Sequence, residues 1–270
     1  MAFLECVGCS LIAFGPSLAI FWVLIVGQPS RLVVFIVSSF FWLLSLLLSS
    51  VAWFMLKELF HAPFAVSLVT SVGFQEFFRY LAFRTLRKAE EALNVVVLVG
   101  SDYDVALVRY HTSFACVSGL GFGTTSAASA MLNLLADVGA GPGTVGFFGD
   151  HGSVDLIIYS ATAACLALLH TLWSVIASNA LLFRRYGVLL FVPAAHLFTA
   201  GVTTLTPNAH RDVLYDVMPL AATGVVLYMS ATTAFVVSGG TPRNLLSCLG
   251  GLLRNPGASS NAPEVPPGQM

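Results

Sequence analysis

The sequence has few charged residues: aspartate, glutamate, lysine and arginine together make up 9% of its 270 residues. Soluble domains carry roughly 25% charged residues, so this composition argues against a soluble globular protein. The formal net charge is only -1, which excludes a strongly basic surface for nucleic acid. The five cysteines lie mostly in apolar runs, and they do not form the framework of a disulfide-rich domain.

Several motifs that carry enzyme chemistry are also absent. The chain contains no Gly-Lys-Ser/Thr of a phosphate-binding loop and no His-Glu-x-x-His of a zinc protease. Asp137, Asp150 and Asp155 lie at the expected outer surface, so the carboxylate pair of an intramembrane aspartyl protease is missing. Residues 141–146 match GxGxxG, but they follow an apolar run and include a proline, which indicates a loop. We therefore expect no catalytic, cofactor-binding or metal-binding residue.

Hydrophobic residues, in contrast, make up 57% of the chain. They fall into seven apolar runs of the length that spans a bilayer as a helix. These runs cover, approximately, residues 3–26, 32–56, 64–83, 110–136, 156–183, 187–205 and 213–237. We expect a linker over residues 94–108. The sequence thus predicts an all-α polytopic membrane protein, with residues 1–240 as a seven-helix transmembrane domain and 241–270 as a largely disordered cytosolic tail.

The basic residues predict how the chain is oriented. Seven spans put the termini on opposite sides, and one side then holds only Lys57 and Arg211. The other side holds most of the remaining basic residues: Arg31, Arg84, Arg87, Lys88, Arg109, Arg184, Arg185, Arg243 and Arg254. Because cytoplasmic loops are enriched in lysine and arginine, we expect a lumenal or extracellular N-terminus and a cytosolic C-terminus.

The fourth apolar run contains an unusual density of small residues. On a helix they form one stripe, which we call the small-residue ridge: Ala115, Gly119, Gly123, Ser126, Ala127 and Ala130. Larger residues lie on the opposite side: Phe114, Val117, Thr124 and Leu132. Helix association in a membrane depends on close backbone approach. The ridge therefore predicts a helix that packs tightly against another helix.

Among the ionisable residues inside the apolar runs, four are candidates for a role in packing or chemistry. Glu76 and Arg79 are i,i+3 neighbours, and we expect a structural ion pair, with Arg79 extending to the headgroups; a transport or proton site is the alternative. His170 and His196 lie in different runs. We expect them to form hydrogen bonds that fix helix packing, and a metal ligand, a proton relay or a catalytic base are the alternatives.

A serine protease is one competing hypothesis. Ser118-Gly119 in the fourth run and His196 in the sixth are similar to the serine–histidine dyad of rhomboid proteases, in which a base activates the serine. The glycine expected two residues before the serine is Cys116 here, which weakens the match. A channel or transporter that uses both histidines is a further alternative.

Taken together, motifs in the same order and in corresponding spans resemble the anterior-pharynx-defective (APH) family, the seven-span subunit of gamma-secretase. The likeness covers nearly all of residues 3–240. It rests on these segments: Ala13-Phe14-Gly15-Pro16, Phe40-Phe41-Trp42-Leu43, Gln75-Glu76-x-x-Arg79, Val117-Ser118-Gly119, Asn133-Leu134-Leu135-Ala136-Asp137, Gly141-Pro142-Gly143, Leu169-His170-Thr171-Leu172-Trp173, His196-Leu197 and Ser238-Gly239-Gly240.

The resemblance implies a non-catalytic scaffold that binds presenilin, nicastrin and the small presenilin-enhancer subunit, and that supports cleavage of Notch- and amyloid-precursor-like type I membrane proteins. It implies residence in the endoplasmic reticulum, Golgi and plasma membrane. The family has three glycines at four-residue spacing in the fourth span; Gly119 and Gly123 match the first two, and Ala127 replaces the third. The family's two intramembrane histidines match His170 and His196. The resemblance suggests that the small-residue ridge faces a partner chain.

Overall fold

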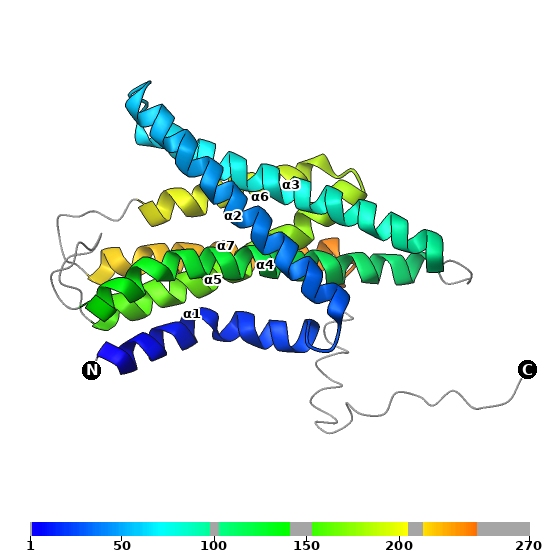
Figure 1. The fold of residues 1–270 in the computed structure, drawn as a ribbon, viewed down its shortest axis with the longest axis horizontal. Helices are drawn as coiled ribbons and strands as arrows, with labels where there is room; N and C mark the ends of the chain where they lie inside the picture. Colours follow the sequence, from blue (N-terminus) through cyan, green and yellow to red (C-terminus); the bar gives the residue numbers. More distant parts are fainter. Residues whose placement is uncertain (1, 98–102, 141–152, 205–212, 242–270) are drawn as a thin grey trace, which may run out of the picture.

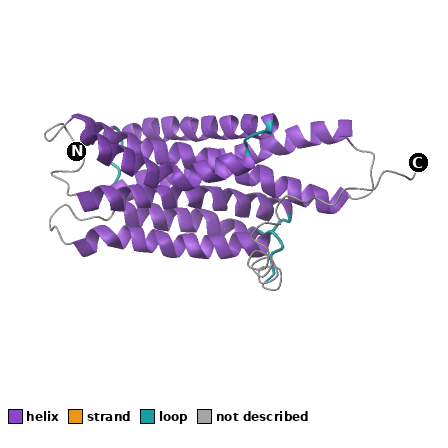
Figure 2. Cartoon of the chain, turned by 90° about the horizontal axis from the view of Figure 1, so that it is seen from below, coloured by secondary structure: helices purple, strands orange, loops and turns teal. Residues whose placement is uncertain are grey.

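The chain is a bundle of long helices. The computed structural model describes the backbone of residues 2–97, 103–140, 153–204 and 213–241. Within these residues every regular element is an α-helix (Figure 2), so the all-α prediction is confirmed. The helices are α1 (Ala2–Leu24), α2 (Pro29–Glu58), α3 (Phe64–Val97), α4 (Tyr103–Ala140), α5 (Ser153–Leu182), α6 (Tyr186–Thr204) and α7 (Val213–Val237).

Five of these helices are long and apolar enough to cross a membrane on their own: α1, α2, α5, α6 and α7. The other two carry polar or small residues where the others carry large apolar ones. In α3 the charged residues Glu76 and Arg79 interrupt the apolar sequence but not the helix. In α4 the small-residue ridge lowers the mean hydropathy. These five apolar helices make the chain a multi-pass membrane protein.

The prediction of a linker over residues 94–108 is wrong at both ends of that segment, which are helical. The backbone is helical up to Val97 and again from Tyr103. Neither the 84–97 segment nor the 103–110 segment contains glycine or proline, so nothing in them breaks a helix. The polar residues after Phe83 extend α3 beyond its apolar part without ending it.

The helices α4 and α5 form the centre of the bundle. Figure 1 shows consecutive helices running in opposite directions, with α1, α4, α5 and α7 roughly parallel to the long axis and α2 crossing them at an angle. The most extensive contact joins α4 to α5, and α5 also contacts α1, α6 and α7. Val117, on the side of α4 away from the small-residue ridge, is fully buried against α1 and α2. Over residues 111–132, where its side chains are described, α4 is therefore mostly surrounded by other helices of the same chain.

Candidate functional site

The small-residue ridge of α4 packs against the backbone of α5. A Cβ atom on Gly119 would lie 2.7 Å from the Cα atom and 2.7 Å from the carbonyl oxygen of Thr171. On Gly123 the added atom would meet the carbonyl group of Ala167 more closely still. The space that a side chain would need is filled by peptide groups, which cannot rotate away as a flexible side chain can. Both positions therefore require glycine.

The expectation that this ridge faces a partner chain is wrong at Gly119 and Gly123. Gly119 and Gly123 are buried against α5 of the same molecule, whereas Ser126 and Ala130 are only partly buried. The physical requirement, close approach of two backbones, is the same for a contact within a chain and for one between chains. Small-residue spacing predicts the close contact but cannot identify the helix on the other side.

Ala127, at the third position of the ridge, occupies a different environment. Its side chain is 1% exposed and packs with small residues of α1 and α5, among them Ala13 and Ala163. The methyl group has its own place in this cluster. The third position consequently keeps small-residue packing without the absolute need for glycine that holds at Gly123.

Gly121 makes a third close contact, which the small-residue ridge does not predict. A Cβ atom there would lie 2.5 Å from the carbonyl oxygen of Phe35 on α2. Beside it, the hydroxyl of Ser39 donates a hydrogen bond to the carbonyl oxygen of Gly121 at 3.2 Å. Gly121 points away from the ridge, so α4 approaches α2 and α5 closely on two sides. The alternating glycines at 119, 121 and 123 are the feature of the sequence that could have indicated this.

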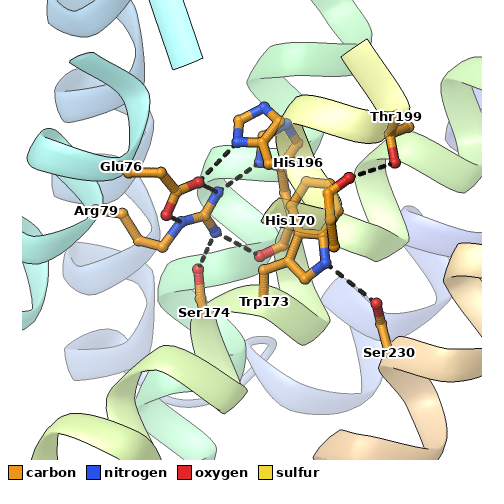
Figure 3. Close-up of polar contacts among 9 residues, drawn as sticks. Glu76, Arg79, His170, Trp173, Ser174, His196, Thr199 and Ser230 are labelled. Carbon is orange, nitrogen blue, oxygen red and sulfur yellow. Dashed lines mark hydrogen bonds and ion pairs between the residues drawn. The ribbon is translucent and has the colours of Figure 1, made fainter. Parts of the chain in front are cut away.

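A polar network of Glu76, Arg79, His170 and His196 joins α3, α5 and α6 (Figure 3). Arg79 is 5% exposed, and its guanidinium has five N–H donors. Two of them bond to the carboxylate of Glu76, at 3.1 and 3.3 Å. The other three reach α5: the carbonyl oxygen of His170 at 3.0 Å, its Nδ1 at 2.9 Å and the Oγ of Ser174 at 2.9 Å. Every donor of this buried cation is therefore satisfied.

The same carboxylate links α3 to α6. The Oε1 atom of Glu76 lies 2.7 Å from Nδ1 of His196. Glu76 thus bonds both to Arg79 on its own helix and to His196 on α6. A buried carboxylate and a buried guanidinium each cost free energy unless they are paired and hydrogen-bonded, and here each compensates the other.

Trp173 connects both histidines to α7. Its ring centroid is 5.4 Å from that of His170 and 4.8 Å from that of His196. Its indole Nε1–H donates to the Oγ of Ser230 on α7 at 3.1 Å (Figure 3). Tryptophan provides a large apolar surface with a single donor. In this position it fills the space beside the histidines and adds a fourth helix to the contact.

The direction of Arg79 differs from the sequence-based expectation. Its side chain does not extend toward the headgroups but points into the bundle, with the guanidinium carbon 5.3 Å from the centre of the Phe122 ring on α4. The reason is that acceptors on α5 and the carboxylate of Glu76 lie within reach there. The ion pair and the two histidines, predicted as separate features, form one connected site.

The geometry does not assemble a serine–histidine dyad. The Oγ of Ser118 accepts a hydrogen bond from Ser38 of α2 at 2.8 Å, while His196 bonds to Glu76. Each side chain has a different partner, so the helix-packing interpretation accounts for both. Among the side chains that the structure describes, no group of three His, Cys, Asp or Glu residues is arranged to hold a metal ion.

Some of the sequence-based expectations lie outside the described residues. These are the GxGxxG segment at 141–146, Asp150, Arg211 and the tail from residue 242.

The chain is similar to one known family over nearly its full length. The family described as "Aph-1 protein" matches residues 4–241. A Drosophila melanogaster protein named "Gamma-secretase subunit Aph-1" is 40% identical over 242 residues, which cover 89% of this chain and 95% of that protein. The Homo sapiens "Gamma-secretase subunit APH-1B" is 35% identical over 251 residues, or 90% and 91% of the two chains. The Caenorhabditis elegans "Gamma-secretase subunit aph-1" is 29% identical over 273 residues, or 93% and 85%.

Proposed function

Because the chain belongs to the Aph-1 family, we propose that it is a non-catalytic subunit of a gamma-secretase complex in the membrane. The observation that carries this proposal is the match along residues 4–241 with proteins named as subunits of that complex. As a scaffold, the chain would bind presenilin, nicastrin and the presenilin-enhancer subunit. It would support cleavage of Notch- and amyloid-precursor-like substrates by presenilin in the endoplasmic reticulum, Golgi and plasma membrane.

The two contact sites support a scaffold role because they fix the bundle from within. The small-residue ridge fixes α4 on α5, and the polar network fixes α3 and α6 on α5. A bundle held in this way keeps its outer faces in constant positions. Those faces carry large apolar side chains such as Trp22, Phe40 and Tyr228, which are 71%, 60% and 71% exposed. In a bilayer such side chains contact lipid or the helices of other subunits.

The proposed orientation has a lumenal or extracellular N-terminus. It is supported by the alternating directions of the helices, because α1, α3, α5 and α7 all end on one side (Figure 1). Basic residues gather at that side, including Arg31, Arg87 and Arg185, while Lys57 lies at the other end of α2. The positive-inside rule makes the basic side cytosolic.

Affinity purification of the tagged chain from membranes tests the function directly. We expect presenilin, nicastrin and presenilin-enhancer chains to co-purify, and intramembrane cleavage of a Notch-type substrate to be lost on depletion and restored by adding the chain back. Wild-type cleavage in membranes depleted of the chain, or purification without these partners, would contradict the proposal. Gly224→Ala is a suitable control, since a Cβ atom at that position meets nothing within 4 Å.

A further inference from the structure

The two histidines of the polar network take opposite hydrogen-bond roles. An arginine guanidinium can only donate, so Nδ1 of His170, 2.9 Å from Nη2 of Arg79, must accept. A carboxylate can only accept, so Nδ1 of His196, 2.7 Å from Oε1 of Glu76, must donate. His170 is therefore neutral with its proton on Nε2, whereas His196 keeps its bond to Glu76 whether its ring is neutral or charged.

We propose that His170 makes the attachment of α3 to α5 sensitive to protons: Arg79 stays bound to α5 only while His170 is neutral. A proton on Nδ1 would remove the acceptor and place a second cation beside the guanidinium. Like charges at that separation repel strongly in a site shielded from water. This inference goes beyond the scaffold function and does not depend on which partners the chain binds.

The described side chains around His170 provide no free charge that would compensate for a second cation. Facing it from α3 are Arg79 and, through Arg79, Glu76; facing it from α6 is His196, with ring centroids 5.1 Å apart. In the described part of the chain, the helices α1, α4 and α7 bring no charged side chain to this contact. Glu76, the anion of the network, already bonds to Arg79 and His196.

Loss of the Nδ1 contact would affect the attachment of α3 to α5 as a whole. The other two bonds from Arg79 to α5 reach the carbonyl oxygen of His170 and the hydroxyl of Ser174, within one helical turn of each other. Beyond this point α3 makes only small contacts with α5 and α4. Repulsion at His170 would therefore act on a polar attachment that holds these two helices together.

The pH range of the effect follows from proton binding. In the closed network, with Arg79 bound to His170, Nδ1 of His170 carries no proton. In an open arrangement that exposes His170 to water, the ring takes up a proton near a pH of about 6.5. The open arrangement then binds one more proton than the closed one. The opening equilibrium constant should consequently rise about tenfold for each pH unit below about 6.5.

Hydrogen–deuterium exchange of the assembled complex measures this opening, with peptides of α3 compared between wild type and His170→Asn. Asparagine offers Oδ1 as an acceptor in place of Nδ1 but takes up no proton. At each pH the ratio of the two exchange rates removes the intrinsic effect of pH on exchange. We expect a ratio near one at pH 7.5 that rises to about ten at pH 5.5. A ratio that stays constant over this range would overturn the proposal.

A matched variant and a second measurement complete the test. His196→Asn removes the other histidine but leaves His170, so its α3 exchange should remain as sensitive to pH as that of wild type; loss of that sensitivity would assign the effect to His196 instead. Nitrogen-15 NMR of the histidine-labelled wild-type complex requires no substitution. It should show His170 protonated on Nε2 alone at neutral pH, and a signal from doubly protonated His170 would refute the proposal even if His170→Asn failed to assemble.

Discussion

The small-residue ridge and the polar network use the same stretch of α5 for two different kinds of contact. At the ridge, the backbone of Ala167 and Thr171 meets glycines that carry no side chain. At the network, His170 and Ser174 present defined acceptor atoms to Arg79. Ser174 belongs to both, because its Cβ would lie 2.7 Å from a Cβ on Gly119 while its Oγ accepts from Arg79. The ridge is sensitive to added volume, and the network is sensitive to a lost donor or acceptor.

The largest effect should come from removing the cation of the network. Arg79→Met leaves the carboxylate of Glu76 without its guanidinium and should destabilise the subunit by about 3–5 kcal/mol. We expect almost no folded subunit in a detergent-solubility assay. The double variant Glu76→Gln/Arg79→Met removes both charges and should recover part of the loss. A double variant that is no more stable than Arg79→Met would contradict the charge-pairing explanation.

At the ridge, a large side chain should separate α4 from α5. Gly123→Leu would place the leucine side chain where the peptide group of Ala167 lies. This overpacking should lower the free energy of unfolding by about 1–3 kcal/mol or more. Recovery of partner subunits by affinity purification should fall sharply, as it should for Gly119→Leu. Gly224→Leu, at a position with open space beside its Cα, serves as the control. Wild-type recovery with Gly119→Leu/Gly123→Leu would refute the close-packing explanation.

A smaller effect is expected where Trp173 joins the network to α7. Trp173→Phe retains an aromatic ring beside the histidines but loses the hydrogen bond to Ser230. Polar contacts between membrane helices contribute about 0.6 kcal/mol on average, so the subunit should unfold at a slightly lower temperature. Ser230→Ala should have a similar effect, and the double variant should be little worse than either. Additive effects would show that the two side chains act independently.

The smallest effect should be that of Ser118→Ala. It removes one hydrogen bond to Ser38 between α2 and α4, worth about 0.6 kcal/mol. Protease activity of the assembled complex should stay close to that of wild type. Loss of cleavage in a complex with all its subunits present would instead indicate that Ser118 takes part in chemistry.

Sequence patterns predicted the helices better than the contacts between them. The seven apolar runs located every described helix, and the bounds of α7 agree at both ends, because bilayer length and hydropathy are local properties. Local spacing also singled out Gly119 and Gly123, but not the helix that covers them. Gly121 and the inward direction of Arg79 depend on which atoms of α2 and α5 lie nearby, and a single chain's spacing does not contain that information. The helical residues 94–97 and 103–108 were not predicted, because hydropathy locates the part of a helix inside the bilayer and not the turns that extend beyond it.

Thermal unfolding of the purified full-length subunit, free of its partners, tests most directly whether the ridge acts within the chain. Gly123→Ala adds one methyl group against the carbonyl of Ala167, and Gly224→Ala adds the same group in open space. A contact within the chain predicts that Gly123→Ala unfolds at a clearly lower temperature than Gly224→Ala, with no partner present. Equal unfolding temperatures, together with reduced partner recovery for Gly123→Ala alone, would contradict a contact within the chain. They would indicate instead that the ridge binds a partner chain.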